Sequence, residues 1–264
     1  MKGLRIAWFN WRDIRNPRAG GAEVYTHEIT KRLAQRGHEI TLITSRFPGA
    51  REREYIDGVE VIRVGGRYTV YVAAMRRYLD DMKNEYDIVI DEINVVPFYT
   101  PLYVKKPVVA LIHQTGGYPL LIRETGPILG TALSIIEHVN PIIYNGKNVR
   151  AIVTVSKSTK AHLIKMGYKV EKIVIIPNGV DTDKYRPGKK AGKPMLLYLG
   201  RLVKYKRIEH ILMAYKLVKQ KIPDVELHIA GTGPEEQKLR RLTKKLNLRD
   251  VYFHGYVDER QKIS

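Results

Sequence analysis

The chain has 264 residues, of which 44% are hydrophobic and 28% charged, and it contains no cysteine. These proportions are near globular averages and exclude collagen-like, mucin-like and disordered chains, while the absence of cysteine excludes disulfide frameworks, thiolate zinc sites and cysteine nucleophiles. The net charge is +19: residues 1–150 carry 21 basic and 16 acidic side chains (+5), and residues 151–264 carry 25 and 11 (+14). Such an excess attracts polyanions, so phosphorylated ligands, anionic lipids and nucleic acids are candidate partners.

The composition also resembles that of heat-adapted proteins, because lysine, arginine, isoleucine and tyrosine are abundant. No signal-like apolar core follows the first residues, and no stretch reaches the roughly 18 apolar residues of a membrane span. The chain is therefore expected to be cytoplasmic, with peripheral attachment to a membrane left open.

The first two thirds of the sequence alternate between apolar strand-like runs and helical patterns. Strands are predicted at residues 4–10, 38–45, 59–64, 87–91, 107–113, 151–155 and 172–176. Helices are predicted near residues 22–33, 71–83 and 157–165, with a long, mostly apolar segment near 122–144. Gly37 is expected to end the first helix in a left-handed conformation, and Ser156 to cap the helix that it precedes. Strand, helix, strand units of this kind assemble into a parallel sheet with right-handed crossovers.

A polar segment at residues 178–194 has the composition of an interdomain linker, and a second alternating unit follows it. Its strands are predicted at residues 195–200, 225–231 and 251–255, and its helices at 208–220 and 235–246. The division places one domain at residues 1–186, overlapping the linker, and a second at 187–264. A doubly wound sheet has about five or six strands, so the second domain is expected to be incomplete.

A double glycine, Gly20-Gly21, lies between the first strand and the first helix. Backbone N–H groups and the positive end of a helix can hold an anion there, and glycine lets a ligand approach the backbone closely. An ordinary tight turn explains the pair equally well. His113 ends a strand and faces the same ligand-binding edge, although most single histidines are packed or hydrogen-bonded.

Two cations, Arg201 and Lys206, follow a strand of the second domain and precede its first helix. A guanidinium and an ammonium at the carboxyl end of a parallel strand favour a phosphate site over two solvated basic residues. Gly231 and Gly233 also stand between a strand and a helix, but Glu236 replaces the third glycine of a dinucleotide fingerprint, so a dehydrogenase is not expected. The paired aspartates in 181–183 are expected to form a turn rather than a metal site.

Together these motifs resemble the retaining glycosyltransferases of family 4, which have the GT-B architecture of two Rossmann-like domains. The likeness extends over nearly the whole chain. It rests on motifs that occur in order, namely Gly20-Gly21-Ala22-Glu23, Arg36-Gly37-His38-Glu39, His113-Gln114, Val155-Ser156, Ile176-Pro177-Asn178-Gly179-Val180-Asp181, Gly200-Arg201-Leu202 with Lys206, Ala230-Gly231-Thr232-Gly233-Pro234 and His254-Gly255-Tyr256-Val257. The expected fold class is α/β and GT-B-like, with one complete Rossmann-like parallel-sheet domain followed by an incomplete second Rossmann-like domain.

The resemblance implies transfer of a sugar from a nucleotide-sugar donor to a glycan or lipid acceptor, with retained configuration and with no metal or other cofactor. The family's basic pair, matched by Arg201 and Lys206, holds the donor diphosphate and stabilises it as it leaves. His113 matches a family residue near the transferred sugar. These three are the expected catalytic residues.

The remaining donor-binding positions are also carried over from the resemblance. Gly20 and Gly21 would approach the diphosphate or the acceptor from the first domain. Gly233 belongs to the donor-binding loop, and Tyr256 and Val257 match the loop beside the nucleobase.

The sequence also departs from the family. Its members continue with a strand ending in Pro-Ser and a segment with two glutamates that hold the donor, and these are absent from the 264 residues. A chain that is truncated, split between reading frames or completed by another polypeptide is therefore expected, with impaired activity. The alternative is a non-catalytic protein that binds a nucleotide, a glycan or an anionic membrane. Nucleic acid is not an expected partner, because the basic residues are not interleaved with stacking aromatics.

Overall fold

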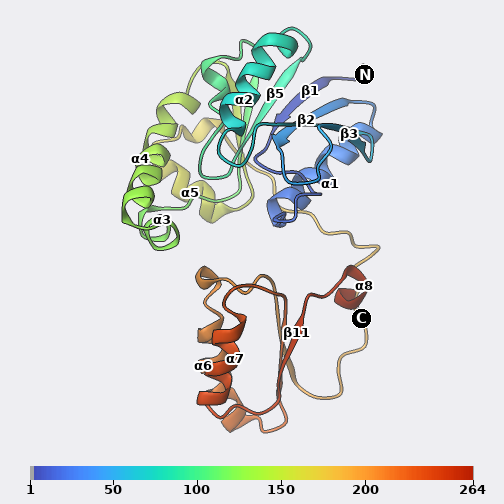
Figure 1. The fold of residues 1–264 in the computed structure, drawn as a ribbon, viewed down its shortest axis with the longest axis vertical. Coiled ribbons are helices and arrows are strands. Elements are labelled where there is room, and N and C mark those ends of the chain that lie inside the picture. The colour runs from blue at the N-terminus through green and yellow to red at the C-terminus, as the bar shows by residue number, and fades with distance from the viewer. Residues whose placement is uncertain (1–2, 264) are drawn as a thin grey trace. The chain divides into compact units, whose positions relative to one another are not determined.

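The chain forms two compact units in the computed structural model, which describes residues 3–263 apart from the side chains of residues 118–120 and 124. Unit 1 is Met1–Gly179 and unit 2 is Val180–Ser264 (Figure 1). Residues 180–194 are exposed throughout and form neither helix nor strand. The point of division at Gly179 lies within the segment whose polar composition suggested a linker.

Unit 1 is built around one eight-stranded sheet with the strand order β3-β4-β2-β1-β5-β6-β7-β8. The strands are β1 (Arg5–Phe9), β2 (Glu39–Ser45), β3 (Arg53–Ile56), β4 (Val59–Val64), β5 (Ile88–Ile93), β6 (Val108–Ile112), β7 (Val149–Thr154) and β8 (Ile173–Ile175). The helices are α1 (Gly21–Gln35), α2 (Val70–Arg77), α3 (Tyr118–Thr125), α4 (Pro127–Tyr144) and α5 (Lys157–Lys165). Three single turns complete the unit, namely a π-helical turn, η1 (Tyr78–Met82), and the 3-10 turns η2 (Thr100–Leu102) and η3 (Val170–Lys172). All pairs are parallel except β3 with β4.

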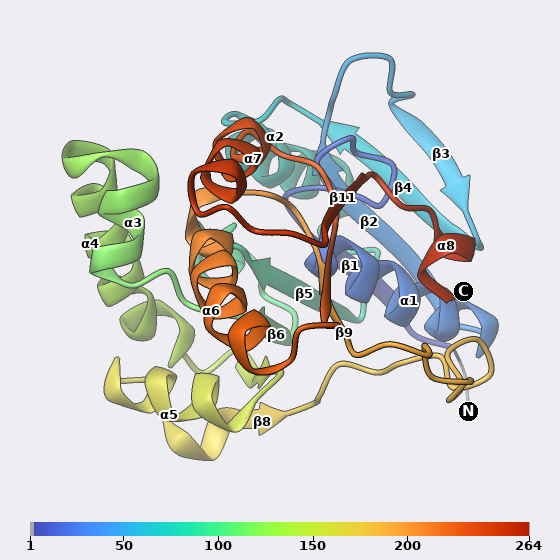
Figure 2. The ribbon, with the colours of Figure 1, turned by 90° about the horizontal axis from the view of Figure 1, so that it is seen from below.

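The sheet of unit 1 is buried on both faces. Successive strand residues point to opposite sides, and each side packs into its own core. Along β1, Ala7 and Phe9 enter a core that α2, α4 and α5 help to form, whereas Ile6 and Trp8 enter a second core. The apolar side of α1 packs on this second core with Tyr25, Ile29 and Leu33. Figure 2 shows α1 beside β1 and β2.

Two local predictions are confirmed. Gly37 ends α1 with a φ of +86°, and its N–H donates to the carbonyl of Ala34. The Ser156 hydroxyl accepts a hydrogen bond of 3.1 Å from the N–H of Thr159 and so caps α5.

Two local features of unit 1 differ from the pattern read from the sequence. The hairpin of β3 and β4 turns at Asp57-Gly58, both at positive φ, and β3 was not anticipated. The apolar segment near 122–144 is two helices, α3 and α4, because Gly126 adopts a φ of +87° between them. They pack side by side at the end of unit 1 that is remote from β3 (Figures 1 and 2).

Unit 2 contains a parallel three-stranded sheet with the order β11-β10-β9. Its elements are β9 (Met195–Leu199), the 3-10 turn η4 (Lys204–Lys206), α6 (Ile208–Lys221), β10 (Glu226–Ala230), α7 (Glu236–Lys245), β11 (Val251–Gly255) and α8 (Glu259–Ile263). Leu227, Ile229 and Phe253 pack beneath α6 and α7 in the core of the unit. On the opposite face Leu197 is 59% exposed and Tyr252 42% exposed, so that face is uncovered by the residues described.

A membrane-spanning helix is not found among residues 3–263, since none of the helices there is long and apolar enough to cross a bilayer.

Candidate functional site

The candidate ligand-binding edge of unit 1 is the edge where β1, β5 and β6 end. These strands are neighbours in the sheet, and the chain leaves β1 toward β2 on one side and returns to β5 on the other. Such a change of direction opens a crevice at the carboxyl ends of parallel strands. Gly20 and Gly21 follow β1, Glu92 lies near the end of β5, and His113 follows β6. Of the predicted residues of unit 1, His113 therefore lies at a strand end, and Gly20 and Gly21 lie at the start of the helix that follows a neighbouring strand.

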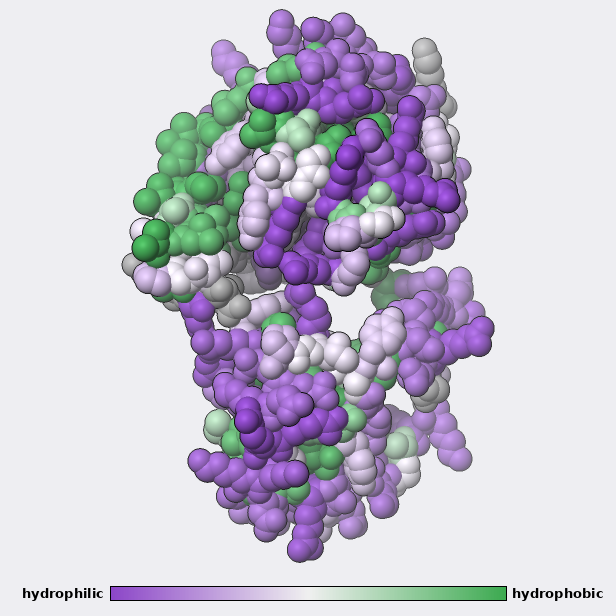
Figure 3. Space-filling model, in the orientation of Figure 1, coloured by the Kyte–Doolittle hydropathy of each residue, from purple (hydrophilic) through white to green (hydrophobic). Residues whose placement is uncertain are grey.

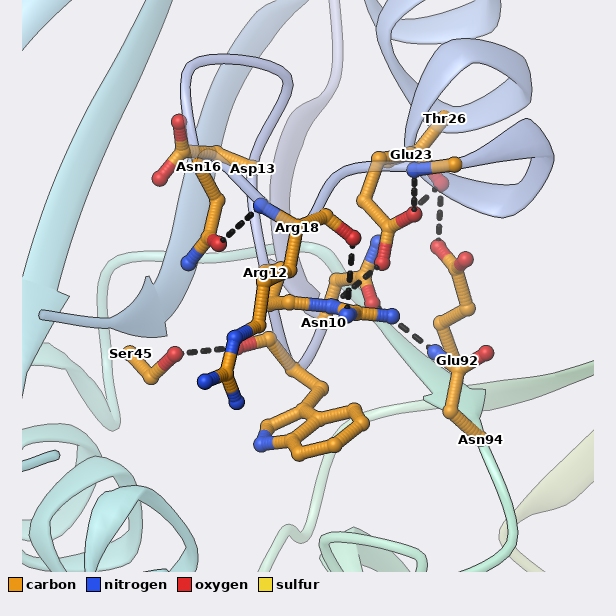
Figure 4. A network of polar contacts seen from close by, with 12 residues as sticks. Asn10, Arg12, Asp13, Asn16, Arg18, Glu23, Thr26, Ser45, Glu92 and Asn94 are labelled. Atoms are coloured by element: carbon orange, nitrogen blue, oxygen red, sulfur yellow. Dashed lines mark hydrogen bonds and ion pairs between the residues drawn. The ribbon is translucent and has the colours of Figure 1, made fainter. Parts of the chain in front are cut away.

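The double glycine begins α1, with Gly20 as the residue before the helix. The N–H of Gly20 donates to the Glu23 carboxylate at 2.6 Å, and Arg12 donates to the other oxygen of that carboxylate at 2.9 Å (Figure 4). Glu23 is 2% exposed. The N–H of Gly20 is thus already bonded within the protein. At Gly21 an added β-carbon would meet no other atom within 4 Å, so there is space beside this residue.

His113 is held by a carboxylate that the sequence motifs did not single out. Its Nε2 lies 3.2 Å from Oε1 of Glu92, and the Tyr25 ring meets the imidazole edge-on at a centroid distance of 4.9 Å. Burial, and to a smaller extent the charge of Glu92, raise the pKa of Tyr25. Because a carboxylate can only accept, Nε2 of His113 carries the hydrogen in this pair.

Glu92 is itself fixed on the opposite side. It is fully buried, and its Oε2 accepts hydrogen bonds from the Trp8 indole at 2.8 Å and from the Thr26 hydroxyl. The amide of Asn10 donates to Thr26 at 3.3 Å and accepts from Asn94, which extends the network across three strand ends (Figure 4). Such a network fixes the orientation of the imidazole before any ligand binds.

Asp91, the residue before Glu92, has a different role although it is equally buried. It accepts hydrogen bonds from the Tyr144 hydroxyl at 2.6 Å, from the N–H of Phe98 and from the N–H and hydroxyl of Thr100. Burial raises the pKa of Asp91. Asp91 joins the β5 end to α4 and to the following loop, so it stabilises the core and does not reach the strand-end edge.

The three strand ends of unit 2 are joined by backbone hydrogen bonds. Gly200 donates to Ala230 at 3.0 Å, and Gly231 donates to Gly255 at 2.6 Å. A side chain on Gly231 would come within 1.9 Å of the Gly200 carbonyl oxygen, and one on Gly233 within 2.3 Å of the Leu202 oxygen. Glycine is required at both positions because the loops approach so closely.

Arg201 and Lys206 both lie at this edge and are exposed. The Arg201 guanidinium donates to the Tyr205 hydroxyl at 3.3 Å, and the Lys206 ammonium lies 5.3 Å from the centre of the Tyr205 ring. Within residues 3–263 neither cation forms an ion pair, although the neighbouring Arg207 is paired with Glu209 at 3.1 Å. Two cations around one tyrosine without a carboxylate partner are suited to an anionic ligand.

The last two predicted residues, Tyr256 and Val257, directly follow β11. The Tyr256 side chain is 78% exposed, and Val257 is half-buried. Unit 2 therefore brings Arg201, Lys206 and Gly233 to the same sheet edge as this pair. The edge offers an exposed aromatic ring together with unpaired cations.

The aspartates that could have been a metal site form a turn. Oδ1 of Asp181 accepts the N–H groups of Asp183 and Lys184, each at 3.1 Å, and Asp183 is paired with Arg186. Across the part of the chain that the structure describes, no group of three or more histidine, aspartate and glutamate side chains could hold a metal ion.

The parallel sheets and strand-end loops of the two units match the GT-B class of glycosyltransferase folds. Two solved structures illustrate the match. HepE from Anabaena, solved in complex with UDP-glucose, matches with a TM-score of 0.67 at 16% identity over 97% of this chain and 70% of its own. A glycosyltransferase from Rickettsia africae matches with a TM-score of 0.70 at 17% identity over 98% of this chain and 70% of its own.

The chain belongs to Glycosyltransferase Family 4, whose model matches residues 19–184, and a second model, Glycosyl transferases group 1, matches residues 180–264. The GDP-mannose-dependent alpha-(1-6)-phosphatidylinositol monomannoside mannosyltransferase of Mycolicibacterium smegmatis is 23% identical over 92% of this chain and 66% of its own length. The N-acetyl-alpha-D-glucosaminyl L-malate synthase of Bacillus anthracis is 22% identical over the same shares. This chain spans about two thirds of the length of these relatives.

Proposed function

We propose that the protein takes part in the transfer of a sugar from a nucleotide-sugar donor to a glycan or lipid acceptor, with retention of configuration. Membership of the family and the similarity to a GDP-mannose-dependent enzyme and to a UDP-glucose complex support the class of donor. The observation that carries the proposal is the unpaired Arg201 and Lys206 at the strand-end edge of unit 2.

In this proposal Arg201 and Lys206 bind the donor diphosphate. They stabilise the negative charge that develops on it as the bond to the sugar breaks, which is the role that a divalent cation has in other transferases. Gly231 and Gly233 allow the strand-end loops to approach each other closely enough to present this edge. Tyr256 and Val257 border the nucleobase. No metal or other cofactor is needed.

His113 acts in unit 1, where the family resemblance assigns it a role near the transferred sugar. Glu92 fixes the imidazole through Nε2, which leaves Nδ1 as the nitrogen available to a ligand. Gly20 and Gly21 complete the candidate edge of unit 1, and Gly21 is the more accessible of the two because a β-carbon added there would meet no other atom within 4 Å. The residues of unit 1 thereby form the acceptor side of the reaction.

We further propose that the 264-residue chain has impaired activity and depends on a completing polypeptide. Parallel sheets are normally covered on both faces, and one face of the unit 2 sheet is uncovered in the described residues. If the chain bound nucleotide but transferred no sugar with or without additional segments, the alternative of a non-catalytic binding protein would replace this proposal.

The test is calorimetry with UDP and GDP on the wild type and on two matched variants. Arg201→Ala removes a proposed diphosphate ligand, and we expect a loss of about 1.5 to 3 kcal/mol in nucleotide affinity. Arg241→Ala removes an exposed guanidinium from α7 and serves as the control for net charge. Equal losses in both variants would indicate general attraction by the basic unit, and an unchanged affinity of Arg201→Ala would contradict the site.

Transfer itself is measured separately by mass spectrometry of acceptor mixtures. We expect that chelation of divalent cations with EDTA leaves nucleotide binding unchanged. A requirement for a divalent cation would show that Arg201 and Lys206 do not suffice to balance the charge of the diphosphate.

A further inference from the structure

The helix α4 has its polar side facing inward and its apolar side facing outward. Its buried positions are mostly small or polar and include Gly130, Ser134, Glu137 and Asn140. A surface helix of a globular protein normally has the opposite arrangement, with apolar residues toward the core. The outer face of α4 therefore requires an explanation other than burial in this fold.

The inner face has clear structural reasons for its residues. The carboxylate of Glu137 accepts the N–H groups of Gly116 and Gly117, at 2.6 and 2.9 Å, and so holds the loop that follows His113. A side chain at Gly130 would come within 2.4 Å of the α-carbon of Ile122, so glycine is needed for α3 to pack closely. None of these contacts uses the outer face.

The outer face carries a stripe of branched apolar side chains. Ile128 is 88% exposed, Ile135 60%, and Ile142 77%, with Ala132 and Val139 at the intervening helical turns. The spacing of four, three, four and three residues keeps them in one line, which at 1.5 Å per residue is about 21 Å long. Figure 3 shows apolar residues gathered over α3 and α4. Leu102, which is 68% exposed on η2 beside α4, extends this surface.

The segment that contains the stripe is basic. Residues 95–156 include five basic and two acidic residues, and one of the acidic pair, Glu137, is buried. Among the described residues the basic side chains of this segment form no ion pairs. They are Lys105, Lys106, Arg123, Lys147 and Arg150.

We propose that the outer face of α4, with Leu102, binds the surface of an anionic lipid bilayer. An amphipathic helix of this kind lies in the interface with its apolar residues among the lipids, while neighbouring lysine and arginine side chains contact the anionic headgroups. The helix lies on the bilayer and does not cross it, in agreement with the absence of a spanning helix among the described residues. This inference does not depend on the proposed sugar transfer.

The charges distinguish this occupant from a second copy of the chain. The spacing of the stripe would also suit the pairing of two α4 helices. Pairing across a two-fold axis would, however, bring the unpaired cations of one copy next to the same cations of the other copy. Like charges oppose such an association. Anionic headgroups complement them.

The experiment is sedimentation of the whole chain with vesicles of phosphatidylcholine alone and with vesicles of equal parts phosphatidylcholine and phosphatidylglycerol. We expect binding to the anionic vesicles and a loss of about tenfold or more in Ile135→Asp and in Ile142→Asp, because each places a charge among lipids. Leu217→Asp, at a residue of α6 that is 64% exposed, is the matched control and should bind as the wild type does. Thermal melts confirm that the variants fold.

The charge contribution is tested with Lys105→Glu and Lys147→Glu. Each should weaken binding to anionic vesicles by at least about fivefold, and added salt should weaken binding of the wild type. Equal binding to neutral vesicles, or no binding to either, would overturn the proposal. A wild-type dimer in light scattering that becomes monomeric in Ile135→Asp would assign the surface to a second copy.

Discussion

Unit 1 and unit 2 are both built on parallel sheets, but only the first has a core on each face. In unit 1, Trp8 and Phe9 are neighbours on β1 and enter different cores, each closed by helices. In unit 2, Leu227 and Ile229 are buried beneath α6 and α7, whereas Leu197 on the other face is exposed. A single layer of helices covers the second sheet.

The number of cores affects both the stability of each unit and the polar groups that the unit can hold in place. Unit 1 can bury polar groups such as Glu92 and Asp91 because two helical layers surround them. The candidate cations of unit 2, Arg201 and Lys206, depend on loops that only one core supports. We therefore expect two unfolding transitions, with unit 2 melting first, since a small unit with one core is only marginally stable.

In unit 1 the largest effect is expected from Asp13→Ala. Arg63 is completely buried and donates to both oxygens of Asp13, at 2.8 and 3.0 Å, while Glu54 lies 2.6 Å away on another side. Removal of the Asp13 carboxylate leaves part of a buried charge uncompensated, which costs about 3 to 5 kcal/mol. Urea titration followed by circular dichroism should show the loss in the unit 1 transition alone.

The control for this prediction is Asp250→Ala in unit 2. Asp250 is paired with Lys219 at 2.5 Å, but its side chain is 44% exposed, so the change should cost less than about 1 kcal/mol. Comparable losses in both variants would show that the units do not differ in the way that their cores suggest.

The sequence predicted the parallel sheets and the local signals that depend on one residue and its neighbours. Gly37 and Ser156 act as expected, because a left-handed residue and a cap are properties of a few adjacent backbone groups. The hairpin at Asp57-Gly58 carried an equally local signal, since this dipeptide favours the tight turn found there. That strand could have been predicted.

The site was only partly predictable for a physical reason. His113 was proposed as a site residue because it follows a strand. Glu92 was not proposed, since its contacts with Trp8 and Thr26 join residues that are distant in sequence. A charged residue at the end of an otherwise apolar strand was the available signal. Likewise the inward polar face of α4 depends on a loop that Glu137 holds, which no helical pattern reveals.

A smaller effect is expected from Gly231→Ala, which tests the loops of unit 2. The new methyl group would meet the Gly200 carbonyl oxygen, and the φ of +135° at this position disfavours any side chain. We expect a loss of about 1 to 3 kcal/mol in the first unfolding transition, and weaker nucleotide binding. The matched change in unit 1 is Gly21→Ala, where the methyl group meets no atom within 4 Å. Equal destabilisation by both changes would contradict the close approach of the strand ends in unit 2.

The smallest effect is expected from Leu197→Lys, and the test asks whether the free energy of unfolding stays nearly unchanged. Leu197 lies on the uncovered face of β9 and is 59% exposed, so a polar residue there should change the free energy of unfolding by less than about 0.5 kcal/mol. The equivalent change on the covered face, Leu227→Lys, should abolish the folding of unit 2.

Differential scanning calorimetry and light scattering would be measured together. A loss of several kcal/mol in Leu197→Lys, accompanied by a change from dimer to monomer, would show that in solution a second copy covers this face, and the contrast between the two units would then apply only to the isolated chain.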